Sequence, residues 1–168
     1  CIRDRAQVAN KCNVAISDIK KMTIWGNHSP TMYPDLDNAE INNESVSTLI
    51  NDKSWIEKDF LQIVQQRGKA IIDARGASSA TSAANAAIDT VKATLSETAE
   101  DDWFSAAVMS DGSYNVPEGI IFGFPLRTNA SGEISIVQNL PISEYAQDKI
   151  NLTTQELLDE KKDVSDLL

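Results

Sequence analysis

The sequence predicts an α+β domain in which long helices pack on an antiparallel sheet. Apolar residues at helical spacing run through residues 52–75 and again through residues 80–95, so two long helices are expected to follow one another. Residues 103–137 contain apolar runs, the last of which follows an Asn-Ala-Ser-Gly turn, a pattern typical of antiparallel strands joined by a hairpin. Because the helices and the antiparallel strands come from separate stretches of the chain, we expect the α+β class.

Length and charge indicate one soluble domain that acts on small molecules. A chain of 168 residues, 42% of them hydrophobic, can bury one core, so we expect a single domain over residues 1–168. Its net charge of −10 opposes non-specific binding to nucleic acid or to an anionic membrane. The sequence shows no apolar run of membrane-spanning length and no secretory leader. We therefore expect a cytoplasmic protein without nucleic-acid or membrane partners.

The cysteines indicate neither a disulfide framework nor a metal site. Cys1 and Cys12 are too few for such a framework, and neither belongs to a Cys-x-x-Cys pair or has a second histidine as a potential co-ligand. We expect two free thiols and no bound metal.

The first part of the chain is expected to contain a helix and two extended stretches. Residues 3–12 alternate basic and small apolar residues, as a surface helix does. Residues 22–25 form a β-branched and aromatic run closed by Gly-Asn, which predicts a buried strand that ends in a loop. A second extended stretch is expected over residues 31–41, with Pro34 at a sheet edge, before a turn at residues 42–44.

The predicted helix over residues 52–75 has an apolar stripe that one charge interrupts. The stripe consists of Ile56, Phe60, Ile63, Val64 and Ile71. Arg67 falls within it, either as a group at the rim of an active site or as a side chain that reaches solvent over its apolar stem, and we favour the second. Gly76 is expected to end the helix.

Serines are expected to begin the two remaining helices. Ser78 and Ser79 precede residues 80–95 and supply candidate N-caps, since serine oxygens accept backbone N–H groups at helix starts. Alanines dominate the apolar face of this helix, which permits close approach by another helix or a sheet. Ser143 is the expected N-cap of the final helix, and a bend is expected at residues 151–154.

His28, the only histidine, is the leading candidate for a catalytic base. It comes just after the predicted strand at residues 22–25, so we expect its imidazole to be held at a strand end that faces a cleft. An imidazole suits proton transfer near neutral pH, although a hydrogen-bonded structural histidine is the more common outcome at such a position. The residues around it favour the catalytic role.

Short motifs along the chain carry a family resemblance. Two of them are Trp-Gly-Asn-His-Ser at residues 25–29 and Tyr-Pro-Asp at residues 33–35. The others, in chain order, are Val-Gln-Gln-Arg-Gly at 64–68, Ala-Ser-Ser-Ala-Thr-Ser-Ala-Ala at 77–84, Val-Met-Ser-Asp-Gly at 108–112, Val-Pro at 116–117 and Phe-Pro at 124–125. The chain thereby resembles cytosolic-type malate dehydrogenases of the lactate/malate dehydrogenase superfamily. The resemblance implies the C-terminal catalytic domain alone, without the Rossmann half, and no Gly-x-Gly-x-x-Gly motif occurs.

The resemblance implies that His28 is the general base and that an arginine upstream of it binds the substrate carboxylate. An ungapped register places this arginine at Arg3, and places the aspartate that orients the histidine one position before Cys1. Asp4 and Arg5 are off register, and a two-residue gap would select Arg5 instead. A guanidinium can form two parallel hydrogen bonds to a carboxylate, which fixes the orientation of a 2-hydroxy acid.

The resemblance also assigns surroundings to the alanine-rich helix over residues 80–95. Its N-terminal serines border the substrate pocket in the family, which implies substrate contacts for Ser79, with Ser78 beside it. His28 and Ser79 would also border the nicotinamide ring of the cofactor. The helix itself lies at the subunit interface in the family, so we expect a homodimer.

These inferences predict the catalytic half of an oxidoreductase that interconverts malate and oxaloacetate by hydride transfer with NAD. Such an enzyme would serve malate metabolism and the tricarboxylic acid cycle. The expected partner is an N-terminal nucleotide-binding half, so the chain by itself should be inactive. Two alternatives stay open: the same half of a lactate or NADP-dependent malate dehydrogenase, and a non-catalytic interaction or antigen domain.

Overall fold

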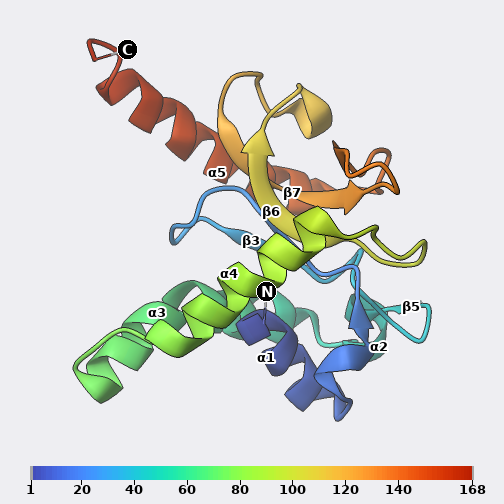
Figure 1. The fold of residues 1–168 in the computed structure, drawn as a ribbon. Helices are drawn as coiled ribbons and strands as arrows, with labels where there is room; N and C mark the ends of the chain where they lie inside the picture. Colours follow the sequence, from blue (N-terminus) through green and yellow to red (C-terminus); the bar gives the residue numbers. More distant parts are fainter. Residues whose placement is uncertain (1, 168) are drawn as a thin grey trace.

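The computed structural model describes residues 2–167, with side chains from residue 4 onward. Its elements, in chain order, are α1 (Ile2–Cys12), η1 (Ile16–Asp18), β1 (Ile19–Lys20), β2 (Thr23–Trp25), β3 (Tyr33–Asp35), β4 (Glu40–Ile41), β5 (Glu44–Ser45), α2 (Val46–Ile50), the π-helix η2 (Trp55–Phe60), α3 (Leu61–Arg75), α4 (Ala80–Leu95), β6 (Phe104–Met109), η3 (Ser113–Asn115), β7 (Ile121–Thr128), β8 (Ile134–Ile136) and α5 (Glu144–Asp163). Short strands lie between the helices, and α5 extends away from the remaining helices (Figure 1).

The strands form three small sheets, and every strand pair among the described residues is antiparallel. The sheet orders are β1-β4-β5, β2-β3 and β6-β7-β8. An isolated bridge between Gly26 and Gly123 connects the end of β2 to β7. Helices and antiparallel sheets in separate stretches of the chain confirm the predicted α+β domain.

Two clusters of buried apolar side chains hold these elements together. The first joins α1 to the small strands and to η2, through Val8, Ile19, Met22, Leu36, Ile41, Val46 and Phe60. The second packs α5 on β7 and β2, through Trp25, Phe122, Phe124, Leu126, Ala146 and Ile150. Burial of apolar surface on this scale is the main driving force for the fold. The strand that precedes His28 ends at Trp25, within the second cluster.

The predicted extended stretch over residues 31–41 is wrong as a single element. It is divided into β3, which pairs with β2, and β4, which pairs with β1. The chain bends between them because Asp35 Oδ1 accepts hydrogen bonds from the backbone N–H groups of Asp37 (2.9 Å) and Asn38 (3.1 Å). An aspartate that accepts backbone N–H groups two and three residues ahead stabilises a turn. The turn expected at residues 42–44 is confirmed, with Asn42 and Asn43 at positive φ.

The helices largely follow their sequence patterns. Residues 52–75 are helical for most of their length, but the first part is the π-helix η2, and Gly76 ends α3 with a positive φ of 69°. Ser143 Oγ accepts a hydrogen bond from the backbone N–H of Ala146 (3.2 Å), which confirms the predicted N-cap of α5. The bend expected at residues 151–154 is not present, since α5 continues unbroken to Asp163.

Apolar side chains on α4 remain exposed in this chain. Ile88, Val91 and Leu95 are 54%, 55% and 78% exposed, and no residue of the helix is buried. Positions 88, 91 and 95 are three and four residues apart, so these side chains share one face of α4.

Candidate active site

His28 follows a strand end that a close backbone contact holds in place. Gly26 donates its N–H to Gly123 O (3.2 Å), and Gly123 donates its N–H to Gly26 O (3.1 Å). A Cβ atom at position 123 would lie 2.8 Å from the carbonyl oxygen of Ile24 and 2.9 Å from that of Gly26. Only a residue without a side chain permits this approach. The bridge fixes the point at which the chain leaves β2 and enters the loop that carries His28.

Trp25 anchors the strand beneath the loop. Its ring is fully buried and meets Tyr114 and Phe124 edge to face, with centroid distances of 4.8 and 6.2 Å. Its indole Nε1–H donates to Asp35 Oδ2 (3.1 Å). Burial raises the pKa of the Asp35 carboxyl, while hydrogen bonds from Asn38 and Trp25 act in the opposite direction. A buried indole with a satisfied N–H gives the strand end a single well-defined position.

The His28 side chain is exposed and lines a pocket of about 600 Å³. The pocket walls come from α1, the loop after β2, α3, α4 and β6, and the side chains that could contact a ligand include Asp4, His28, Gln65, Arg67, Ser82 and Ser105. The pocket holds an imidazole, a guanidinium and a carboxylate, which together can transfer a proton and orient an anion. His28 therefore faces a cleft, as its position after a strand predicts.

Arg67 contributes to this pocket, although its position in the sequence favoured a surface role. Its side chain is exposed, and it lies among the residues that line the pocket. Its exposure fits a side chain that reaches solvent over its apolar stem, and its place in the pocket lining fits a group at the rim of the cleft. Both interpretations of Arg67 stay open.

The serines at the start of α4 divide between two roles. Ser79 occupies the N-cap position, but its hydroxyl bonds to the hydroxyl of Ser82 and not to a backbone N–H. Ser82, and not Ser79, is among the residues that line the His28 pocket. Ser78 is exposed. A substrate contact at Ser79 stays a prediction, and the structure indicates Ser82 as the serine at the pocket wall.

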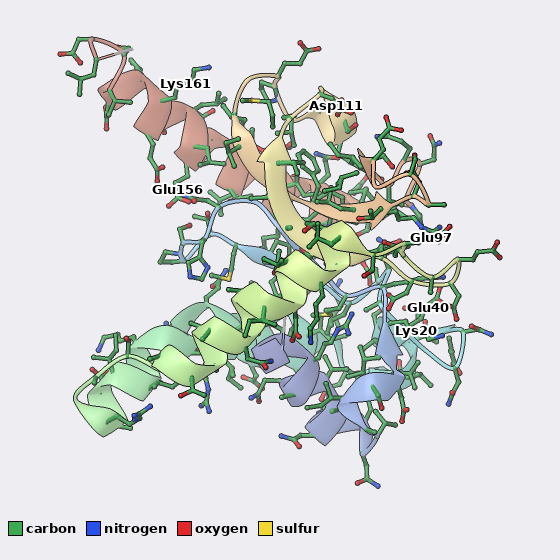
Figure 2. All side chains as sticks on the ribbon, viewed as in Figure 1. Lys20, Glu40, Glu97, Asp111, Glu156 and Lys161 are labelled. Carbon is green, nitrogen blue, oxygen red and sulfur yellow. The ribbon has the colours of Figure 1, made fainter. Side chains whose placement is uncertain are left out.

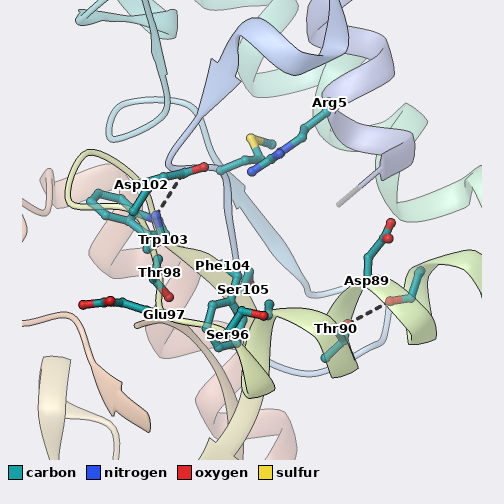
Figure 3. A pocket seen from close by; sticks show the side chains of 14 residues that line it. Arg5, Asp89, Thr90, Ser96, Glu97, Thr98, Asp102, Trp103, Phe104 and Ser105 are labelled. Carbon is teal, nitrogen blue, oxygen red and sulfur yellow. Dashed lines mark hydrogen bonds between the residues drawn. The ribbon is translucent and has the colours of Figure 1, made fainter. Parts of the chain in front are cut away.

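The side chain of Arg3 lies outside the described residues, so its predicted contact with substrate stays a prediction. Its neighbours on α1, Asp4 and Arg5, line two different pockets. Asp4 is 8% exposed and lines the His28 pocket. Arg5 lines an adjoining pocket of about 380 Å³, which also contains Asp102 and Trp103 (Figure 3). Arg5 therefore lines the adjoining pocket and is not among the residues that line the His28 pocket, and which of the two arginines binds substrate stays a prediction.

Sequence inspection missed Asp4, Ser82 and Gly123 as parts of the site. Ser82 could have been found, because residues three apart on a helix share a face and Ser79 was already a candidate. Asp4 lies on a helix face that can be assigned only when the neighbours of the helix are known. Gly123 carries no local signal, since its partner Gly26 comes from a distant part of the chain.

Three further observations on the described residues concern metal ligands, membrane-spanning helices and cysteines. Residues 4–167 contain no group of three or more His, Cys, Asp or Glu side chains arranged to hold a metal ion. No helix within the described part of the chain has the length and apolar character needed to cross a membrane. Cys12 is a free thiol, and burial raises its pKa; Cys1 lies outside the described residues.

Comparison with known proteins shows the family of this chain. The match to the lactate/malate dehydrogenase, alpha/beta C-terminal domain covers residues 1–168. This chain belongs to the lactate/malate dehydrogenase family. The lactate/malate dehydrogenase domain described above is 43% identical to a malate dehydrogenase from Naegleria fowleri, with a TM-score of 0.91 over 99% of this chain and 50% of that one. The family resemblance found in the sequence is thus confirmed at the level of the superfamily and of its C-terminal domain.

Two further structures resemble this lactate/malate dehydrogenase domain. Trichomonas vaginalis lactate dehydrogenase in complex with NADH and oxamate is 28% identical, with a TM-score of 0.90 over 98% of this chain and 51% of that one. Malate dehydrogenase from Plasmodium falciparum in complex with NADH is 23% identical, with a TM-score of 0.81 over 99% of this chain and 54% of that one, and shares the fold. The domain spans about half the length of each of these chains.

Proposed function

We propose that this chain is the catalytic half of an NAD-dependent malate dehydrogenase, which interconverts malate and oxaloacetate. The observation that carries the proposal is the exposed His28 imidazole on a pocket of about 600 Å³. The identity of 43% to a malate dehydrogenase, against 28% to a lactate dehydrogenase, favours malate. Relatives about twice as long as this chain support an N-terminal nucleotide-binding half as its partner. We further propose that the enzyme is cytoplasmic and serves malate metabolism and the tricarboxylic acid cycle.

The proposed roles follow from what each side chain can accept or donate. His28 takes the proton of the substrate hydroxyl while the hydrogen on the carbon that bears this hydroxyl leaves as hydride. In the reverse reaction His28 returns the proton. Arg3 binds the substrate carboxylate through two hydrogen bonds and so orients the reacting carbon. NAD would supply the hydride acceptor, with its nicotinamide next to His28 and Ser79. The open pocket and the exposed imidazole fit a ring that approaches from a second domain.

Lactate dehydrogenase is the second candidate function. The Trichomonas vaginalis lactate dehydrogenase has nearly the same TM-score as the malate enzyme, 0.90 against 0.91. Turnover of oxaloacetate and of pyruvate by the complete enzyme, each with NADH and with NADPH, distinguishes these candidates. Turnover of oxaloacetate with NADH that exceeds the other three combinations supports the proposal. No turnover in any combination would favour a non-catalytic interaction domain.

His28→Asn in the complete enzyme tests the general base. The replacement keeps polarity and approximate size but cannot accept the hydroxyl proton, so we expect kcat to fall by about a hundred- to ten-thousandfold. The thermal midpoint should stay nearly unchanged, because the His28 side chain is exposed. A decrease in kcat of less than roughly tenfold would assign His28 a structural role.

A further inference from the structure

The position of the His28 imidazole depends on the backbone of its loop. Among the described residues, none forms a hydrogen bond to this imidazole, and the side chain is exposed. We define the His28 loop as residues 26–31. A general base must lie within hydrogen-bonding distance of the proton it removes, and small displacements reduce the rate strongly. Contacts that fix the His28 loop therefore also fix the position of the proposed base.

One face of α5 binds the His28 loop on both sides of the histidine. Thr153 is fully buried, and its Oγ1 accepts the backbone N–H of Asn27 (2.9 Å). Glu156, one turn further along α5, projects toward the loop (Figure 2). Its Oε2 accepts hydrogen bonds from Ser29 Oγ and Thr31 Oγ1, both at 2.5 Å. Residues three apart on a helix share a face, so Thr153 and Glu156 act on the loop together.

A single carboxylate oxygen collects most of these contacts. Glu156 Oε2 also accepts from Asn27 Nδ2 (3.2 Å), which makes three donors from the loop. The Ser29 and Thr31 hydroxyls hold the pKa of Glu156 below its ordinary value, so the carboxylate is ionised at neutral pH. Hydrogen bonds to an ionised acceptor are about twice as strong as neutral ones. The Glu156 side chain is only partly exposed, which limits competition from water.

We infer that Glu156 is a positioning residue for the general base: from α5 it binds the loop residues that flank His28 and fixes the imidazole at the pocket. The inference rests on the proposed function, because it gives His28 the role of base. Glu156 does not contact the pocket itself and is not among its lining residues. Its effect on turnover must pass through the loop residues that it binds, which are Asn27, Ser29 and Thr31.

Glu156→Ala in the complete enzyme should lower kcat by roughly ten- to a hundredfold, because the loop and the base become mobile. The KM for NADH should stay unchanged, since the cofactor is held mainly by the other half. Glu156→Gln keeps one acceptor oxygen at the same distance along the side chain. It should therefore retain most of the kcat that Glu156→Ala loses. Asp159→Ala is the matched control, because Asp159 is exposed on the same helix and bonds to Gln155 within α5. An unchanged kcat for Glu156→Ala would overturn the inference.

A double-mutant cycle separates positioning from a general effect on stability. In a Ser29→Ala/Thr31→Val background the loop hydroxyls are already absent. Adding Glu156→Ala should therefore lower kcat by less than about threefold. Equal losses in both backgrounds would show that Glu156 acts by another route and would overturn the inference.

Amide hydrogen exchange of the complete enzyme supplies a measurement that does not need turnover. Exchange across residues 26–31 should increase in Glu156→Ala and stay at the wild-type level in Asp159→Ala. If the wild-type enzyme turned over neither oxaloacetate nor pyruvate, the proposed function would fail, and exchange would still test the contact between Glu156 and the loop. Unchanged exchange in Glu156→Ala would overturn the inference whatever the enzyme turns over.

Discussion

At the scale of single residues, two glycines determine where the loop that carries His28 leaves its strand. Gly26 has a φ of 93°, and a Cβ atom there would lie 2.2 Å from a side-chain carbon of Thr153. A Cβ atom at position 123 would lie 2.8 Å from the backbone oxygen of Ile24 and 2.9 Å from that of Gly26. Backbone atoms move less readily than the end of a flexible side chain, so a methyl group at position 123 has no space.

Gly123→Ala should therefore destabilise the enzyme by about 1 to 3 kcal/mol, as overpacking in a well-packed interior does. Gly68→Ala is the matched comparison, because no atom lies within 4 Å of its added Cβ and the residue is in the middle of α3. That substitution should stabilise by about 0.5 to 1 kcal/mol, since alanine favours a helix interior. Thermal unfolding of both variants measures the difference, and a Gly123→Ala variant as stable as wild type would contradict the geometry.

The substrate arginine can be tested against its neighbour. Arg3→Lys in the complete enzyme should lower kcat/KM for oxaloacetate by roughly ten- to a hundredfold, because lysine cannot form the two parallel hydrogen bonds. The affinity for NADH should be nearly unchanged. Arg5→Lys should have little effect, since Arg5 lines the adjoining pocket and not that of His28. The reverse result in steady-state kinetics would place a two-residue gap in the register and make Arg5 the substrate arginine.

At the scale of elements, α4 and α5 each follow a serine in the N-cap position, but only one of these serines caps its helix through its side chain. Ser143 Oγ accepts the backbone N–H of Ala146, whereas the Ser79 hydroxyl pairs with that of Ser82. The two helices also differ in what they contact. The buried residues of α5 pack on β7 and β2, and its Thr153 and Glu156 bind the His28 loop, while α4 has no buried residue.

Ser143→Ala should lower the free energy of unfolding by about 1 kcal/mol, because a backbone N–H at the start of α5 loses its acceptor. Ser79→Ala should cost less than half as much, since no backbone donor depends on its hydroxyl. Both values come from denaturant-induced unfolding of the complete enzyme with the wild type as reference. Equal costs for the two variants would mean that the Ser143 cap contributes no specific stabilisation.

At the scale of the whole molecule, the distribution of exposed apolar side chains indicates a second protein surface. Ile88, Val91 and Leu95 lie on one face of α4 and are each more than half exposed. The family resemblance assigns this helix to the subunit interface, so we propose a homodimer that buries the face.

Val91→Glu should shift the complete enzyme from dimer to monomer in sedimentation velocity experiments, because an unpaired charge at the centre of an apolar interface is costly to desolvate. Leu152→Glu is the control, since Leu152 is 53% exposed on α5, far in sequence from α4. This control should sediment like the wild type. A Val91→Glu enzyme that remains a dimer at the same concentration would place the interface elsewhere.

The sequence by itself determined the features that depend on neighbouring residues in the chain. Helical spacing predicted α3 and α4 and the end of α3 at Gly76, and the hairpin of β7 and β8 followed from the turn at residues 129–132. Ser143 was predicted as a cap because capping needs only a serine before a helix. His28 was singled out as the only histidine, just after a predicted strand, and the Trp-Gly-Asn-His-Ser motif around it favoured a catalytic role, which stays a prediction. Each of these inferences needs only a short window of sequence, since helices, turns and caps are local structures.

Only the tertiary structure decided the contacts that join distant segments. It divided residues 31–41 between β3 and β4, since each part has a different partner strand. It brought Gly123 to Gly26 and Glu156 to Ser29, and it directed Asp4 and Arg5 into different pockets. No spacing in the chain encodes such pairs, because they form only when separate elements pack around a shared core. The proposed chemistry at His28 rests on the sequence, whereas its proposed positioning rests on contacts with helix α5, which begins more than a hundred residues later.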